Sequence, residues 1–446
     1  MSNTAAPTAP SAASIGWRLG ALYGPAIYGV SAAAVALPVA AGALHTSPVT
    51  AVWILTIHAL GLGVGAAVAG RAIDLAGPRR TLSLGVLLLA AGAAICVVAT
   101  VLAVAVAGRA LLAAGSGTMT ATALTLATGR PPPQRATVLA RLGAVMALFS
   151  ATAPLAGALA VTASWRTAMV LPALSLIALP LCWQLTPRHP TAAARVDWIG
   201  AALLATAAAG LLLTIQSATL HLPPPAVAGL VVGTCALAVI AGRHRRGHPR
   251  GFIAPVISQR RFLLCALAGA GIYGGLFACV YAVPQMLTRL GCTAETIGLL
   301  LLPSAFIAAA AARLAGQVTS ESARRRMLAG VAAVFSVSML AAGFNHRPVA
   351  LLCATTAGFT AFALAQTTLT AAVTADLRAA QRGGAVGLLN LTFFVGGAVG
   401  ASVCSVLWQP WGLPAALAVI SVLPAVAAVG ACAAIPCRPP TGCTQA

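Results

Sequence analysis

Long apolar runs dominate this sequence and decide what it can fold into. Of its 446 residues, 60% are hydrophobic and 7% are charged, whereas roughly 25% of the residues in ordinary soluble proteins are charged. A soluble fold of this length needs a polar surface that so few charged residues cannot supply. Because about 20 apolar residues cross the membrane hydrocarbon as a helix, the sequence predicts an all-α polytopic membrane protein.

Fourteen apolar runs are predicted to be transmembrane helices. They are Leu19–Leu44, Ala51–Ala72, Thr81–Thr100, Val101–Thr128, Ala136–Thr162, Arg166–Leu185, Trp198–Ser217, Pro224–Gly242, Phe262–Leu287, Ala294–Gln317, Met327–Phe344, Val349–Ala372, Ala385–Trp408 and Leu413–Ile435. Polar connections follow the sixth and the eighth run. The expected organisation is therefore a six-helix bundle (19–185), a linker with two extra helices (186–261) and a second six-helix bundle (262–436), between a disordered cytoplasmic tail (1–18) and a second cytoplasmic tail (437–446).

The basic residues predict the orientation in the membrane. The net charge is +21, and every one of the 26 basic residues is an arginine. With the N-terminus placed inside, 22 arginines fall in cytoplasmic positions, as the preference of basic loops for the cytoplasm requires. These arginines lie in short clusters between apolar runs, so we interpret them as a topology signal and not as a nucleic-acid interface. Both termini are expected to be cytoplasmic.

The loop after the second run carries a spaced set of glycines and charges. Gly77 precedes Pro78, a pair that favours a tight turn, and Gly70 permits close approach of helices. Asp74 is the lone acid among arginines; it could pair with Arg79 or Arg80, or cap a helix N-terminus. A degenerate copy, with Gly316, Glu321 and Arg324 to Arg326, follows the tenth run, as expected of duplicated halves.

Two ionisable side chains are predicted inside the membrane. Arg109 lies in the fourth run, where a permanent charge should face a wet cavity or polar partners. Its alternative role is structural, as a donor to carbonyls of a neighbouring helix. His58 lies in the second run, and an imidazole titrates in the physiological range, so it is the candidate for proton exchange. The alternative is a buried histidine that never titrates.

Proline, glycine and aromatic residues suggest a gate and a cavity. Pro154 and Gly157 should kink the fifth run and let it pack closely, although such residues are also common in membrane helices. Tyr273, Phe277 and Tyr281 share one helix face and are candidates to line a substrate cavity or simply to pack. The other cavity candidates are Tyr28, Phe149, Gln285 and Asn390. We expect Gln285 and Asn390 to form hydrogen bonds between helices.

These motifs together resemble the major facilitator superfamily, and the sequence is most similar to its fourteen-span drug:proton antiporter branch. The loop signature is carried by Gly70, Asp74, Gly77, Arg79 and Arg80, and the intramembrane arginine motif by Arg109 with Gly115 and Gly117. The span-five antiporter motif is half present, as Pro154 and Gly157, followed by the Trp165–Arg166 pair. The resemblance implies two six-helix bundles with two extra central helices.

The resemblance also implies a function and its partners. The expected protein is a bacterial plasma-membrane exporter of a drug or secondary metabolite, coupled to protons, monomeric and without a cofactor or a nucleic-acid partner. Its substrate would be amphipathic or aromatic. Gly29 and Ala34 replace an Asp and an Asn usual in the branch, so no intramembrane carboxylate is present. A proton-independent importer or facilitator, and a non-transporting scaffold or sensor, remain alternatives. No sequence signature of an enzyme occurs.

Overall fold

The computed structural model describes residues 11–46, 48–51, 53–187, 197–215, 217, 222–248, 257, 259–318, 320–345, 347–375 and 377–434. Across these residues the chain is helical and contains no strand. The predicted tails 1–10 and 437–446, and the loop residues around Arg188, Arg195, Arg250, Asp376 and Arg438, lie outside the described residues.

The N-terminal half consists of nine α-helices and one 3-10 segment. They are α1 (Ala12–Tyr23), α2 (Pro25–Ala43), α3 (Pro48–Ala51), α4 (Trp53–Ala76), α5 (Pro78–Val98), α6 (Leu102–Thr128), α7 (Pro132–Ala163), α8 (Trp165–Val170), η1 (Leu171–Leu174) and α9 (Ser175–Trp183). The extra pair is α10 (Trp198–Ile215) and α11 (Pro224–Gly247). The C-terminal half is α12 (Arg260–Arg289), α13 (Ala294–Gln317), α14 (Glu321–Phe344), α15 (Pro348–Thr374), α16 (Ala379–Ile420) and α17 (Val422–Ala434).

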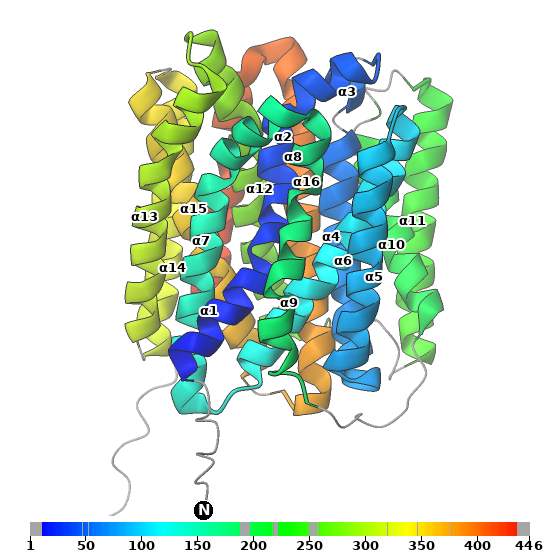
Figure 1. Cartoon of the computed structure of the whole chain (residues 1–446), viewed down its shortest axis with the longest axis vertical. Helices are drawn as coiled ribbons and strands as arrows, with labels where there is room; N and C mark the ends of the chain where they lie inside the picture. The colour runs from blue at the N-terminus through cyan, green and yellow to red at the C-terminus, as the bar shows by residue number, and fades with distance from the viewer. Residues whose placement is uncertain are drawn as a thin grey trace, which may run out of the picture.

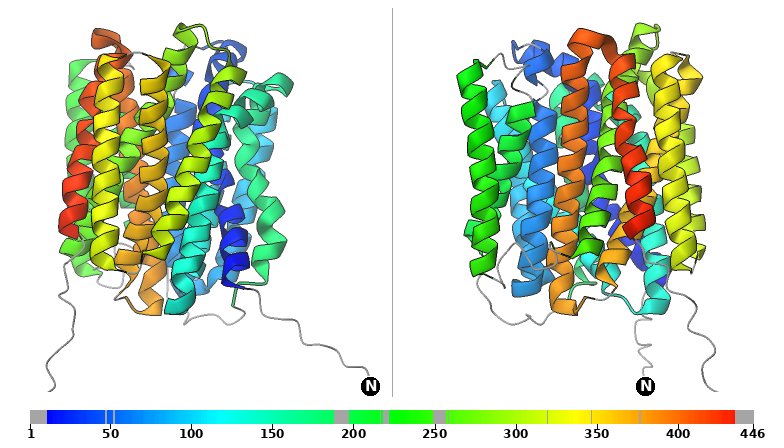
Figure 2. Two further views of the ribbon diagram at one scale, coloured as in Figure 1. Left: turned by 90° about the vertical axis from the view of Figure 1, so that its left-hand side faces the viewer. Right: turned by 180° about the vertical axis from the view of Figure 1, so that it is seen from behind.

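Proline sets many of the helix starts. Helices α2, α3, α5, α7, α11 and α15 each begin at a proline. The ring fixes a helical φ, and the first residue of a helix has no use for an N–H donor. Inside the last long helix, Gly412 has a φ of +81°, which interrupts the helical backbone between Pro410 and Pro414. Helix α16 is thus two helices that meet at a sharp kink, and together with α17 it covers the final two predicted spans (Figure 2).

The first helix begins earlier than the sequence predicted. The hydroxyl of Ser11 accepts a hydrogen bond from the N–H of Ser14, which is the usual N-cap arrangement, and α1 starts at Ala12. The prediction of a disordered tail to residue 18 is therefore wrong for residues 12–18. Ile15 and Gly16 are buried, so packing against the bundle adds to the cap in holding this segment helical.

The helices stand side by side along one long axis (Figure 1). Eleven runs are long and apolar enough to cross a membrane, or twelve when the bent α7 is counted, by length and composition in the described chain. The last of these runs, Gln381–Ala433, covers 53 residues but is counted once. The apolar part of α10, Ile199–Ile215, is shorter than the counted runs and is not among them. The predicted fold class, an all-helical polytopic membrane protein, is confirmed, whereas the count of fourteen spans remains a prediction.

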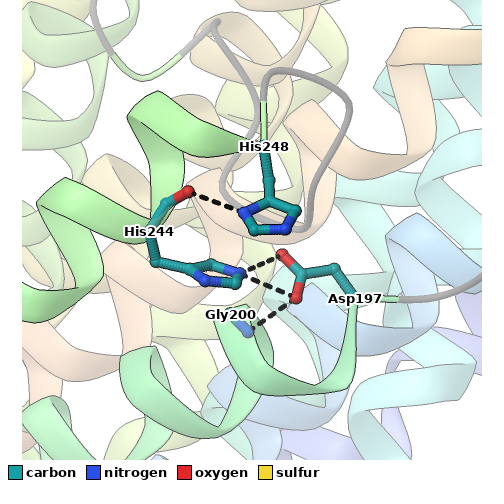
Figure 3. A network of polar contacts seen from close by, with 4 residues as sticks. All are labelled: Asp197, Gly200, His244 and His248. Carbon is teal, nitrogen blue, oxygen red and sulfur yellow. Dashed lines mark hydrogen bonds and ion pairs between the residues drawn. The ribbon is translucent and has the colours of Figure 1, made fainter.

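The extra helices α10 and α11 form a hairpin at one side of the bundle (Figure 1). Asp197 caps α10 by accepting the N–H of Gly200 at 2.9 Å, and its two carboxylate oxygens lie 2.9 and 3.0 Å from Nε2 of His244 near the end of α11 (Figure 3). This pair closes the hairpin at one end. Helix α10 also contacts α4 and α16, while Ala241 is the one buried residue in α11.

Candidate functional site

Arg109 is fully buried in α6 and binds three other segments of the N-terminal half. Its guanidinium donates to the carbonyls of Gly29 in α2, of Met169 in α8 at 2.7 Å and of Ile54 in α4 at 3.4 Å. A planar guanidinium has five donors in a rigid arrangement and suits several acceptors at once. Arg109 thus donates hydrogen bonds to backbone carbonyls of neighbouring helices, as in the alternative structural role. These bonds connect α2, α4 and α8 to α6.

His58 lies beside this cluster. Its ring is fully buried, and neither nitrogen has a hydrogen-bond partner of ordinary geometry among the described residues. The imidazole is packed against Gly29, where a Cβ atom would overlap Nε2, and it lies within electrostatic range of Arg109. The histidine ring from α4 thus occupies the space that a side chain at position 29 would take.

The C-terminal half contains a second buried polar group. The hydroxyl of Tyr273 in α12 donates to Oε1 of Gln366 in α15, whose amide donates to Oδ1 of Asn390 in α16 at 3.2 Å. Asn390 completes the chain by donating to the carbonyl of Val386 at 2.9 Å. Aromatic rings surround Tyr273, with centroids 4.8 to 6.1 Å away; they belong to Phe277, Phe362, Phe393 and Phe394.

The two halves leave a small apolar cavity between them. Helix α2 contributes Val30 and Ala34, α4 contributes Thr56, and α12 contributes Phe277 and Tyr281. Its volume of about 20 Å³ is room for about one water molecule. Phe277 and Tyr281 thus lie at this cavity, whereas Tyr273 lies in the polar cluster. A larger hollow of about 300 Å³ lies elsewhere between the halves, where α7 faces α14 and α15.

Asp74 joins the halves at the end where α4 stops. Its carboxylate accepts the backbone N–H of Gly383 at 3.0 Å and of Gly384 at 2.7 Å, both in the second turn of α16, which starts at Ala379. The guanidinium of Arg71 lies 4.0 Å from the carboxylate. Asp74 therefore binds two backbone amides near the start of a helix that belongs to the opposite half of the molecule.

Glycines make this contact between α4 and α16 possible. A Cβ atom on Gly70 would overlap the carbonyl of Gly383, and one on Gly387 would crowd the carbonyl of Ala66. The halves meet again toward the other end of the bundle, where Gly298, in the first turns of α13, lies against Leu155 of α7. Contact near both ends explains why the cavity between the halves is closed.

The remaining residues of the loop shape its turn. Gly77 has a φ of +84°, a conformation that favours glycine, and Pro78 starts α5. The guanidinium of Arg79 lies 5.0 Å from the ring centre of Trp183, and Arg80 is exposed. In the second loop, Glu321 pairs with Arg261 at 3.5 Å, within the C-terminal half. Asp74 of the first loop thus bonds to the opposite half directly, whereas Glu321 pairs within its own half and lines a hollow that α7 borders.

Helix α7 is bent by 45° between Ser150 and Thr152, one turn before Pro154. The proline ring removes a hydrogen bond to the preceding turn and crowds its carbonyl, which accounts for the position of the bend. Gly157 lies against the backbone of Ala32 in α2, where a Cβ atom would overlap the carbonyl oxygen. These two residues therefore control the path of α7 beside α2.

The other predicted cavity residues lie apart from the small cavity. The rings of Tyr28 and Phe149 pack at a tilt with their centres 5.1 Å apart, and the hydroxyl of Tyr28 is 2.9 Å from that of Thr152. Gln285 donates to the carbonyl of Tyr281 in its own helix, so the prediction of a bond between helices is wrong for it, because its amide reaches the preceding turn. Sequence reasoning missed Gly383 and Gly384, whose backbone amides carry no side-chain signal.

The fold and this arrangement define a class: a polytopic helical membrane protein whose two halves meet across a central interface. The model of the Major Facilitator Superfamily matches residues 19–401, and the chain belongs to this superfamily, whose members are transporters and not enzymes. No curated protein matches.

Two solved structures share this fold. The crystal structure of the human organic anion transporter MFSD10 (TETRAN) matches with a TM-score of 0.63 and 15% identity, covering 94% of this chain and 98% of that one. The proton:xylose symporter XylE, bound to 6-bromo-6-deoxy-D-glucose, matches with a TM-score of 0.64 and 13% identity, covering 93% of this chain and 94% of that one.

Proposed function

We propose that this protein is a fourteen-span member of the drug:proton antiporter branch, and that it exports an apolar or aromatic small molecule across a plasma membrane. The observation that carries the proposal is the interface between the halves. It is closed where Asp74 binds α16, and between its ends it holds an apolar cavity flanked by two aromatic side chains, Phe277 and Tyr281. An apolar lining with a few polar groups suits such a substrate.

Alternating access provides the mechanism. The halves separate at the arginine-rich end when α16 leaves Asp74, which admits substrate from the cytoplasm. They then close there and separate at the other end, where α7 meets α13, which releases it. Arg109 keeps the helices around the N-terminal side of the cavity together, and the Tyr273–Gln366–Asn390 chain does so on the C-terminal side. Pro154 and Gly157 belong to the gate, which is the contact between α7 and α13 that opens to release substrate, because they set the path of α7.

Proton coupling is assigned to His58. The acids of the described chain lie at helix ends: Asp74, Asp197, Glu295 and Glu321. His58 is a buried titratable side chain of the cavity-lining helix α4, and it lies within electrostatic range of Arg109. Because the acids of the described chain lie at helix ends and not inside the membrane, a second candidate function is a facilitator, which moves its substrate in either direction without protons.

Transport in inside-out vesicles tests the proposal. We expect vesicles containing the protein to accumulate fluorescent apolar or aromatic compounds when a proton gradient is imposed. The His58→Ala variant should no longer respond to the gradient but should still exchange substrate without it. His45→Asn is the matched control, since His45 is an exposed histidine with a φ of +49°, which asparagine tolerates. It should behave as the unsubstituted protein.

The outcomes separate the candidate functions. Equal movement of substrate with and without a gradient would support the facilitator and remove the proton from the mechanism. Net movement out of inside-out vesicles would indicate an importer. If no member of a chemically diverse compound panel moves, and if deletion and overexpression leave resistance to that panel unchanged, the protein is a scaffold or sensor.

A further inference from the structure

The extra hairpin does not pack flush against the bundle. A groove of about 610 Å³ separates α10 and α11 from three helices of the C-terminal half, and its walls are almost wholly apolar. One residue from each helix marks it: Leu204 of α10, Ala238 of α11, Leu267 of α12, Val395 of α16 and Val426 of α17. Its volume lies within the range of about 300–1,000 Å³ that small-molecule sites occupy.

This groove is open at its rim. Leu267 and Val426 are 51% and 45% exposed, and Ala238 is exposed as well. The lining residues belong to helices that cross the membrane, so the exposed rim faces hydrocarbon. Apolar walls offer water too few hydrogen-bond partners for stable occupancy. The natural occupant of such a space is therefore an acyl chain.

Arginines lie below the groove on the same helix faces. Arg245 follows Ala238 by seven residues in α11, and Arg260 precedes Leu267 by seven in α12. Seven residues are two turns, so each arginine shares the face of its groove residue and lies about 10 Å from it along the axis. Helix α11 runs toward this end and α12 starts from it, which places both guanidinium groups on one side.

Nearby acids do not cancel this charge. Asp197 is held by His244 and by the N–H of Gly200 (Figure 3). Glu321 lies 3.5 Å from Arg261, which leaves Arg245 and Arg260 as additional positive groups at this end. The combination of an apolar groove and paired arginines two turns away matches the dimensions of a phospholipid: a tail in the groove and a phosphate at the arginines.

We propose that the groove is a binding site for an anionic phospholipid, which fills the space between the extra hairpin and the C-terminal half. The tail replaces the side-chain packing that α11 lacks, and the headgroup sits between Arg245 and Arg260. This proposal does not depend on the transported substrate or on its direction. It assigns a role to the hairpin, which is to hold a lipid against the moving half.

Lipid retention measured by native mass spectrometry tests the site. The full-length protein is purified in detergent and titrated with phosphatidylglycerol or with phosphatidylcholine carrying the same tails. Each arginine near a membrane surface contributes about fivefold to anionic-lipid binding, so two predict a preference of roughly 25-fold for phosphatidylglycerol. Arg245→Gln combined with Arg260→Gln should remove it, and Ala238→Trp, which fills the groove, should abolish retention of both lipids.

Matched variants keep the test specific. Arg243→Gln removes one charge from the same helix end on another face, and Ile240→Trp adds the same bulk at the same depth on the opposite side, where Ile240 is 48% exposed; both should bind like the unsubstituted protein. Equal retention of the two lipids, or undiminished binding by Ala238→Trp, would overturn the proposal. Displacement of the lipid by millimolar inorganic phosphate would also overturn it, since the tail would then contribute nothing.

Discussion

Gly29 is the residue at which the two buried side chains of His58 and Arg109 meet the backbone of α2. The missing side chain leaves room for the His58 ring, and the Gly29 carbonyl accepts a hydrogen bond from Arg109. One backbone position thus contacts both intramembrane ionisable groups. Any larger side chain at this position must displace the histidine, because the two would occupy the same volume.

This overlap predicts a pairwise dependence. Gly29→Ala should destabilise the protein by about 1–3 kcal/mol, the usual cost of overpacking. In a background that carries His58→Ala, the same change should cost much less, because the smaller side chain frees the space. Thermal unfolding of the four proteins in one detergent measures the coupling. Gly330→Ala in α14, where a Cβ atom meets nothing within 4 Å, controls for the substitution itself, and additive effects of Gly29→Ala and His58→Ala would refute the packing described.

At the scale of elements, the contact between α4 and α16 depends on one carboxylate and three glycines. Gly70, Gly383 and Gly387 bring the backbones together, and Asp74 accepts hydrogen bonds from the amides of Gly383 and Gly384 in the second turn of α16. A side chain of one helix that binds two backbone amides of another links the positions of the two elements directly.

Asp74→Asn should loosen this end of α16. The amide can accept through one oxygen only, and the negative charge is lost. A hydrogen bond to a charged group contributes about 1.5–3 kcal/mol, so the amides of Gly383 and Gly384 should exchange with deuterium roughly 10-fold to 100-fold faster. Hydrogen-exchange mass spectrometry measures this rate. Glu321→Gln, in the related loop, should leave it unchanged; unaltered exchange in Asp74→Asn would show that the glycines alone hold the contact.

The elements were more predictable than their partners. Hydropathy located most helices, and the spaced glycines and charges around Asp74 were among the motifs that indicated the superfamily. The partners of Asp74 are backbone amides more than 300 residues away, and those of Arg109 are carbonyls of three other segments. Every residue has such groups, so no residue type marks them. The start of α1 was missed because an apolar count does not register the cap at Ser11.

For the whole molecule, the orientation and the number of spans decide which end of the bundle faces the cytoplasm. Helix α10 has 18 residues, a length of about 27 Å, which is close to the hydrocarbon thickness of about 30 Å. The start of α1 and the end of α17 lie at the same end of the bundle (Figure 2). An even number of spans satisfies this arrangement.

Reporter fusions test the orientation. Alkaline phosphatase fused after Leu222 should be active, since it lies outside, and green fluorescent protein fused after Gly247 or at the C-terminus should fluoresce, since it lies inside. The preference of arginine-rich loops for the cytoplasm gives the direction. Fluorescence of a fusion after Leu222 would show that α10 does not cross the membrane, and the prediction of fourteen spans would then fail.

The three carbonyls bound by Arg109 have a consequence for how the protein can move. Sliding α2, α4 or α8 past α6 would strand a buried guanidinium or a buried carbonyl in hydrocarbon, which is costly. The N-terminal half is thereby stiffened from within and should turn as a single block. The changes of shape must then be concentrated at the seams between blocks, where small residues meet backbone, and the glycines of α4 and α16 act as the surface on which one block rocks over the other.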